Sequence, residues 1–210
     1  MRIIEDSNGK RTMSSALVAV LLGASLMMAG MLHGTSIAYA TPYEVSGEKS
    51  YLTLPGTTTW DPVLERCALL DSMTVLSGRV LTVGQGVTLF VDAKAKVTSW
   101  GTITNQANAT LGIAGKMTVN SGATLVNSGA FSNSGTLANS GVLVNSADAV
   151  VKNTGRITNA GTLTNLAGAA FTNSGSITND AIINNQGHIE NRGTLTVSKE
   201  TMLPAHKEQL

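Results

Sequence analysis

The sequence predicts an all-β protein folded as a three-sided parallel β-helix, which is a solenoid of short strands. Asparagine recurs every six or eight residues from Asn127 to Asn191, and a glycine or alanine follows each asparagine two residues later. An apolar residue occurs at a fixed later place in every six- or eight-residue segment. Because both spacings are even, each residue type stays on one side of an extended chain, whereas a helix would scatter it. Asparagine and serine favour turns, so short strands separated by bends are expected to coil.

The spacing also predicts the size of each coil. Two six-residue segments and one eight-residue segment, or three six-residue segments, give coils of 18 to 20 residues, and these divide naturally into three sides. At about 4.8 Å per coil, the repeat predicts roughly six or seven coils and a rod of about 30 Å.

Residues 1–40 are typical of a secretory signal peptide. Three basic residues lie among the first eleven, an apolar run covers residues 16–32, and the small-residue sequence AYA ends at Ala40. A signal peptidase cleaves after such a sequence, so we expect secretion or cell-surface display of a mature chain that begins at Thr41. A membrane anchor is the alternative, since the apolar run approaches the length of a span. Met13 is an alternative start to Met1.

Residues 41–70 are expected to cap the first coil. Asp61 resembles a helix N-cap followed by proline, and Leu64, Cys67 and Ala68 would share one face of a short helix. An irregular strand is the alternative reading of this segment. Cys67 is the single cysteine of the chain, so no internal disulfide is possible and its role is open.

The solenoid repeat is expected over residues 71–197, with two kinds of inward position. Apolar residues are expected to meet on the axis, and asparagines at the corners are expected to stack in hydrogen-bonded ladders that satisfy their amides. Glycine or alanine beside the apolar residue would leave room for it. The ladder residues are Asn127, Asn133, Asn139, Asn145, Asn153, Asn159, Asn165, Asn173, Asn179, Asn185 and Asn191. The core residues are Leu89, Val97, Leu111, Leu125, Phe131, Leu137, Leu143, Val151, Ile157, Leu163, Phe171, Ile177, Ile183, Ile189 and Leu195.

The two ends of the repeat depart from this code. Upstream, the corner positions hold Val83, Val91, Ile113 and Val119, so the ladder should give way there to apolar stacking. Downstream, residues 198–210 are polar and break the pattern, which indicates a weak cap or a frayed tail.

The six-residue segments NTGRIT, NAGTLT and NSGSIT resemble the β-helical repeats of bacterial secreted adhesins, namely autotransporter passengers and filamentous-haemagglutinin-like proteins. The likeness covers about 125 residues of the chain. It implies a β-helical fold and an adhesin-like role, but such repeats specify fold better than partner. The expected outer-membrane barrel and two-partner secretion domain are not recognisable in the sequence.

An enzyme, a cofactor and a metal site are not expected. The most suggestive charged set is Asp148, Lys152 and Arg156, which we interpret as a solvated face, with Asp148 serving as a turn residue. His188 is interpreted as an outward, solvated residue. Hexapeptide-repeat acyltransferases want glycine closely after the aliphatic residue and a catalytic histidine, whereas in most segments of this repeat Thr, Ala, Val or Ser follows the aliphatic residue. The sequence shows no CxxC motif, clustered metal ligands or phosphate loop.

The expected function is a non-enzymatic structural element that assembles with copies of itself outside the cell as an oligomer or extracellular filament. With 14 basic and 13 acidic residues the chain carries a formal net charge of +1, which argues against nucleic acid as partner. An adhesin that binds a glycan, a matrix component or a component of the cell envelope is the alternative. Ice binding is a third reading, but the steps of twenty residues from Thr162 reach Val142 and Ile182, so no long threonine stack is expected.

Overall fold

The computed structural model describes residues 4–5, 11–12, 43–45, 58–61 and 63–198 of the chain. The chain divides into two units, Met1–Tyr39 and Ala40–Leu210. In the first unit, strands β1 (Ile4–Glu5) and β2 (Arg11–Thr12) pair antiparallel. The apolar run and the cleavage site of the expected signal peptide lie outside the described residues. Within the described part of the chain, no helix is long and apolar enough to cross a membrane.

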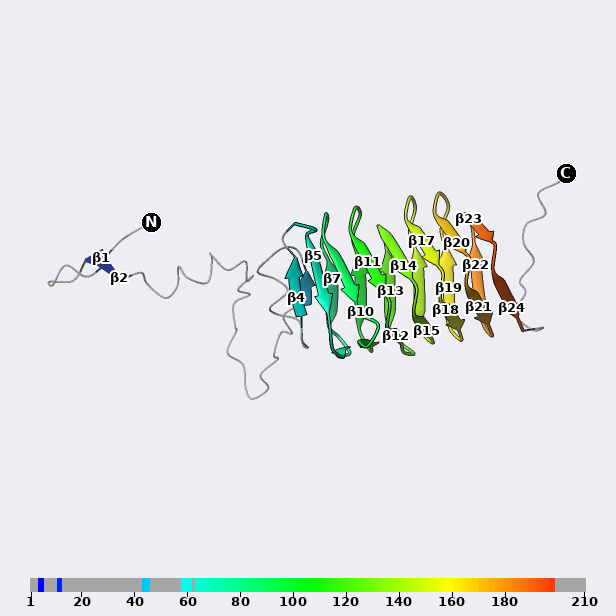
Figure 1. The fold of residues 1–210 in the computed structure, drawn as a ribbon, viewed down its shortest axis with the longest axis horizontal. Coiled ribbons are helices and arrows are strands. Elements are labelled where there is room, and N and C mark those ends of the chain that lie inside the picture. Colours follow the sequence, from blue (N-terminus) through cyan, green and yellow to red (C-terminus); the bar gives the residue numbers. More distant parts are fainter. Residues whose placement is uncertain (1–3, 6–10, 13–42, 46–57, 62, 199–210) are drawn as a thin grey trace, which may run out of the picture. The chain divides into compact units, whose positions relative to one another are not determined.

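The second unit is a parallel β-solenoid (Figure 1). Sheet 1 has the strand order β22-β19-β16-β13-β10-β7-β3, sheet 2 has the order β23-β20-β17-β14-β11-β8-β5-β4, and sheet 3 has the order β24-β21-β18-β15-β12-β9-β6. Each coil gives one strand to each sheet in turn, so neighbours in a sheet are three strands apart in the chain. The three-sided parallel β-solenoid predicted from the repeat is therefore confirmed.

The strands are short and regular. Their bounds are β3 (Tyr43–Val45), β4 (Thr58–Asp61), β5 (Arg66–Leu69), β6 (Met73–Val75), β7 (Val80–Val83), β8 (Thr88–Val91), β9 (Lys96–Ser99), β10 (Thr102–Asn105), β11 (Thr110–Ile113), β12 (Lys116–Val119), β13 (Thr124–Asn127), β14 (Ala130–Asn133), β15 (Thr136–Asn139), β16 (Val142–Asn145), β17 (Val150–Asn153), β18 (Arg156–Asn159), β19 (Thr162–Asn165), β20 (Ala170–Asn173), β21 (Ser176–Asn179), β22 (Ile182–Asn185), β23 (His188–Asn191) and β24 (Thr194–Val197).

Coil length varies more than the sequence led us to expect. Equivalent corner asparagines are 18 residues apart from Asn127 to Asn145 and 20 apart from Asn139 to Asn159, which agrees with the prediction. From Asn105 to Asn127 the separation is 22 residues. This coil contains two eight-residue segments, each with a wider turn, and the prediction allowed for only one.

The predicted capping helix is wrong. Residues 66–69 form strand β5, which pairs antiparallel with β4 and parallel with β8. Asp61 does accept hydrogen bonds from the backbone N–H groups of Val63 and Leu64, at 3.0 and 3.1 Å, as an N-cap would. The turn ends at Glu65, where φ is 45°. The chain is extended beyond it because Cys67 and Leu69 alternate into the core with a period of two.

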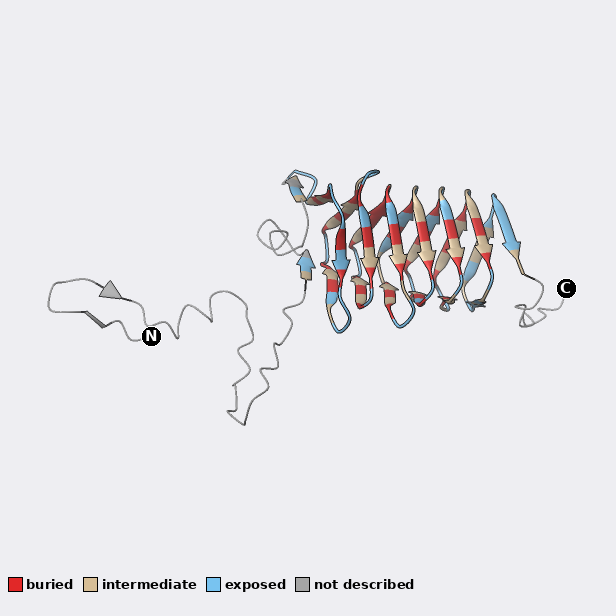
Figure 2. Ribbon diagram, turned by 90° about the horizontal axis from the view of Figure 1, so that it is seen from below, coloured by how far each residue is buried: buried red, intermediate tan, exposed pale blue. Residues whose placement is uncertain are grey.

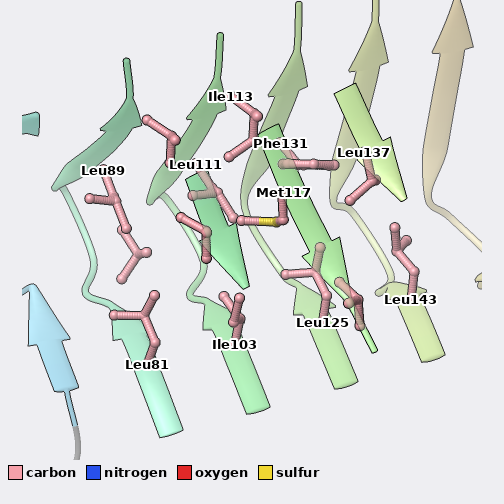
Figure 3. Packing of buried hydrophobic residues seen from close by; sticks show 14 of the residues in the cluster. Leu81, Leu89, Ile103, Leu111, Ile113, Met117, Leu125, Phe131, Leu137 and Leu143 are labelled. Atoms are coloured by element: carbon pink, nitrogen blue, oxygen red, sulfur yellow. The ribbon is translucent and has the colours of Figure 1, made fainter. Parts of the chain in front are cut away.

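The core is a column of apolar side chains along the solenoid axis. In most strands the second and fourth residues are buried and the first and third are not, which produces the banded pattern in Figure 2. Leu111, Met117 and Leu125 enter one coil from three different sheets and meet inside it (Figure 3). The next coil repeats this arrangement with Phe131, Leu137 and Leu143. Apolar residues therefore stack on apolar residues from coil to coil, for example Leu111 on Phe131.

Candidate functional site

Asparagine ladders run along all three corners of the solenoid, as the sequence predicted. A corner residue is here the last residue of a four-residue strand. In each ladder the side-chain Nδ2 of one asparagine donates to Oδ1 of the asparagine one coil later, at 2.6 to 2.9 Å. The ladders are Asn105-Asn127-Asn145-Asn165-Asn185, Asn133-Asn153-Asn173-Asn191 and Asn139-Asn159-Asn179. Asn105 is a member that the sequence interpretation missed, although its segment fits the eight-residue template.

Each carboxamide does more than join two side chains. Asn159 Nδ2 donates to Asn179 Oδ1 at 2.6 Å and also to the backbone oxygen of Ile182 at 2.9 Å. Asn159 Oδ1 accepts from Asn139 Nδ2 at 2.7 Å. Because the side chain is fully buried, these contacts replace water entirely. The ladder consequently fixes how each coil sits on the next.

The ladders have a direction, and their first members show it. In every bond between two ladder asparagines, the amide donates toward the C-terminal end and the side-chain oxygen accepts from the N-terminal side. The first members, Asn105, Asn133 and Asn139, have buried Oδ1 atoms without a donor. The residues one coil earlier in register are Val83, Ile113 and Val119, which have no polar side chain to offer. The N-terminal part thus stacks aliphatic corners at these positions, as predicted, with the buried Ser99 between Val75 and Val119 as an exception.

The corner glycines have a different role from the one we expected. They do not make space on the axis; they let the backbones of successive coils approach closely. A Cβ atom on Gly155 would overlap the backbone oxygen of Gly135, and one on Gly135 would overlap that of Gly115. Glycine is required at such a close backbone approach because any side chain would push the coils apart.

Most of the predicted core residues are buried, but the last three are not fully so. The residues at most 5% exposed are Leu89, Val97, Leu111, Leu125, Phe131, Leu137, Leu143, Val151, Ile157, Leu163, Phe171 and Ile177. Ile183 and Ile189 are only partly buried, and Leu195 is 42% exposed, so Leu195 is not a core residue. These three lie in the last coil, and no described strand covers them. Leu81, Ile103 and Met117 are core residues that continuing the even spacing upstream would have found.

The charged residues considered for catalysis lie apart. Asp148 occupies the turn before β17 with φ of 62°, which supports its interpretation as a turn residue. Lys152 faces outward on sheet 2 and Arg156 faces outward on sheet 3. His188 is exposed at the start of β23. Among the described residues, no group of three or more histidine, cysteine, aspartate or glutamate side chains could hold a metal ion.

Sheet 3 carries a row of threonines that corrects the reading of the outer surface. Outward positions in register are Thr74, Thr98, Thr118, Ala138, Thr158, Thr178 and Thr196. The prediction that no face stacks threonine over several coils is therefore wrong, because it followed only the register of Thr162 on sheet 1. The neighbouring outward row on sheet 3 contains Lys96, Lys116 and Arg156, so the threonine row does not widen into a flat uncharged array.

Sheet 1, in contrast, presents an uncharged outer face from β7 to β22. Its first outward row is Val80, Thr102, Thr124, Val142, Thr162 and Ile182, and its second is Thr82, Thr104, Val126, Val144, Thr164 and Asn184. Val80, Val142 and Ile182 are 36 to 42% exposed. We call this the sheet 1 face.

Trp100 adds an aromatic group at the corner between sheets 3 and 1. It follows β9 directly and is 50% exposed. Lys96 starts the same strand, and Lys116 lies beside Lys96 in the next coil. All three side chains reach solvent, with the two lysines at the start of their strands and Trp100 just beyond the end of β9.

The C-terminal coil, formed by β22, β23 and β24, is the open end of the rod. These strands are the last in their sheets. Leu163, Phe171, Ile177, Ile183, Ile189 and Leu195 line an apolar pit of about 70 Å³ at this end. In Figure 2 the final strand is drawn as exposed, whereas the preceding strands alternate between buried and half-buried residues.

The buried thiol of Cys67 is the one titratable group with a clearly displaced pKa among the described residues. Desolvation in the core raises the pKa of Cys67 from 9.0 to about 11. The side chain is 0% exposed, so the neutral thiol packs as a small apolar group.

The architecture of the described residues defines a class of protein: a parallel β-solenoid that presents outer faces and an open C-terminal end. Residues 74–205 match the family model for the BigA fourth domain, and the match covers more than half of the chain. The chain therefore belongs to the BigA fourth domain family, which suggests a bacterial surface protein of adhesin-like type. No curated protein sequence and no solved structure matches the chain significantly.

Proposed function

We propose that this protein is a secreted, non-enzymatic structural element of the bacterial surface that associates side by side with copies of itself. The observation that carries the proposal is the sheet 1 face, which has twelve outward positions and no charge. Flat sheets pack face to face at about 10 Å through such β-branched side chains. The resemblance to autotransporter passengers and filamentous-haemagglutinin-like repeats is part of the same proposal.

The size of the sheet 1 face sets the strength of this association. Strand spacing and rise give the face an area of about 400 Å² per copy. A stable protein interface needs about 800 Å² per partner, so one pair of faces should dissociate readily. Association then depends on high local concentration, as on a crowded cell surface, where many weak contacts act together.

A charged residue placed on the sheet 1 face tests the proposal. In sedimentation velocity of the purified chain beginning at Thr41, we expect reversible association that grows with concentration. Val142→Lys should abolish it, because Val142 lies between Thr124 and Thr162 in the middle of the face. Thr178→Lys, at an outward position on sheet 3, should associate like the wild type. Monomers at every concentration, or equal effects of both substitutions, would refute side-by-side association.

An adhesin that binds a glycan is the second candidate, and the exposed Trp100 at the end of β9 favours it, together with the outward Lys96 and Lys116 that start β9 and β12. Aromatic rings offer apolar area with a polar edge, and lysines attract acidic groups. A glycan array probed with wild type and Trp100→Ala should show acidic glycans bound by the wild type and lost in the variant. An array without bound glycans, or one unchanged by the substitution, would remove this candidate.

A further inference from the structure

The C-terminal coil ends two ladders with amides that have no asparagine to donate to. Asn185 accepts from Asn165 at 2.9 Å, and Asn191 accepts from Asn173 at 2.7 Å. The Asn185 amide has no acceptor among the described residues, and the Asn191 amide reaches only the backbone oxygen of Gly193, at 3.2 Å. Both side chains are exposed. An internal asparagine such as Asn145 instead has the next asparagine and a strand carbonyl of the next coil as acceptors.

The three sheets and the apolar core are also incomplete at this end. The outer edges of β22, β23 and β24 pair with no further strand in the described part of the chain. Ile183, Ile189 and Leu195 border the apolar pit, which lies where the axis residues of a next coil would sit. Unpaired strand edges over an exposed apolar patch are a template for strand addition.

The opposite end of another copy does not complement this end. The corner residues of β5, β6 and β7 are Leu69, Val75 and Val83, all fully buried, and β3 continues sheet 1 with Val45 in register with Val83. None of these four residues has a side-chain oxygen to accept from an amide. In addition, β4 already pairs antiparallel along the outer edge of β5. Head-to-tail stacking of identical copies would therefore leave the Asn185 and Asn191 amides without a side-chain acceptor on the next copy.

Two C-terminal coils do not complement each other either. In every ladder the amide points toward the C-terminal end, so two such ends would bring donor groups against donor groups. The required partner has the opposite feature, which is a side-chain oxygen facing its own N-terminal side. The first ladder members of this chain, Asn105, Asn133 and Asn139, show such oxygens without donors.

We propose that the C-terminal coil binds the first coil of a different β-solenoid polypeptide, with asparagine or aspartate at the corners above Asn185 and Asn191. Its strands would extend the three sheets in parallel, and its aliphatic inward residues would fill the pit beside Leu195. Only above Val197 does an apolar corner residue of the partner fit, because the third ladder has already ended at Asn179. This interaction uses the end of the rod, so it does not depend on the sheet 1 face.

A synthetic peptide with the sequence of residues Thr162–Asn179 is a suitable probe, since it supplies one strand for each sheet in the correct order. Placed on the C-terminal coil, its asparagines equivalent to Asn165 and Asn173 would lie above Asn185 and Asn191. We expect the fluorescently labelled peptide to bind the full chain in an anisotropy titration. A control peptide with leucine at those two positions should bind at least about tenfold more weakly, because the amides lose their acceptors.

Variants of the full chain locate the binding. Leu195→Lys should abolish peptide binding, because it places a charge in the pit. Thr196→Lys, on the outward side of the same strand, should not, and neither should Val142→Lys on the sheet 1 face. The last variant separates this inference from the proposed self-association, since each can fail alone.

Three results would overturn the inference. Equal binding of the two peptides would show that acceptors at the corners are not recognised. No binding by either peptide would show that the end is not a docking surface. Binding only after deletion of residues 199–210 would show that the chain's own C-terminal segment occupies this end.

Discussion

The corner asparagines hold the coils of this protein in register because each carboxamide bonds to the coils on both sides. Inside a ladder, both polar atoms of the buried carboxamide have side-chain partners, and those partners exist only if the neighbouring coils carry asparagine too. The loss of stability caused by a substitution should therefore depend on which polar atoms it leaves buried without a partner. A lost ladder member leaves one donor and one acceptor buried without a partner.

Replacing Asn159 by leucine tests this expectation. The Asn139 amide and the Asn179 oxygen would both lose their side-chain partner, and the free energy of unfolding should fall by roughly 1 to 3 kcal/mol. Thr162→Val is the control, because Thr162 faces outward between two aliphatic neighbours and should change stability by less than about 0.5 kcal/mol. Urea unfolding of the three proteins measures both values. Similar, small effects at the two positions would contradict the structural importance of the ladder.

The buried thiol predicts a loss of stability at alkaline pH. The pKa of Cys67 is about 11 in the folded protein and 9.0 as a model thiol. Above pH 9 the unfolded chain releases this proton while the folded protein keeps it, so stability falls as pH rises toward 11. The loss should reach about 2 to 3 kcal/mol. Cys67→Ala should lack this part of the pH dependence when unfolding curves are compared between pH 8 and 11. Parallel curves for both proteins would argue against the shifted pKa.

At the scale of the element, the unit that gains stability is the coil and not the single strand. A strand of four residues gains its stability from neighbours three strands away in the chain. The turns repeat as well. The fourth residue of several eight-residue segments has a positive φ, and this residue is Gly122, Asp148 or Gly168. Glycine and aspartate tolerate this conformation, which explains a sequence preference that we had interpreted only as a general turn signal.

Removal of a whole coil should preserve the fold, whereas removal of one residue fewer should not. Deleting residues 134–153 joins Asn133 to Thr154 and retains every inward and outward position. Deleting residues 134–152 shifts the following chain by one residue, which would place the downstream apolar side chains outside. We expect a cooperative urea transition and β-type circular dichroism for the first variant, and a loss of cooperative unfolding for the second. Equal stability of both variants would contradict the inward and outward assignments.

For the whole molecule, ladders and apolar stacking dominate and charges contribute little. The chain has a formal net charge of +1, and the ion pair formed between described residues joins the exposed side chains of Glu190 and Arg192 at 2.7 Å. Exposed pairs of this kind contribute about 0 to 1 kcal/mol and are screened by salt. The free energy of unfolding should therefore change by less than about 1 kcal/mol between roughly 0.05 and 0.5 M sodium chloride. A larger decrease in the free energy of unfolding, measured by urea unfolding at each salt concentration, would show that charges contribute substantially to stability.

The arrangement of the whole molecule explains how much of the candidate site could be predicted from the sequence. The outward residues of each strand were recognisable from their alternation with the core, but the threonine row on sheet 3 was not. A row across coils joins residues about twenty positions apart, and one extra turn of two residues shifts every later partner. The uncharged sheet 1 face and the Trp100 corner depend on the same register. They became visible only when the strands were paired.

The sequence by itself determined the fold class, the ladder residues and most of the core, because an even spacing assigns each residue to one side of an extended chain. It could not decide how residues 58–69 fold, since a capping aspartate followed by apolar residues suits both a helix and a tight turn before a strand. Pairing of β5 with β8 decided that segment. Only the tertiary structure determined the direction of the ladders and the open amides of Asn185 and Asn191. A hydrogen bond between coils has a donor and an acceptor end, and a repeating sequence does not indicate which end points outward.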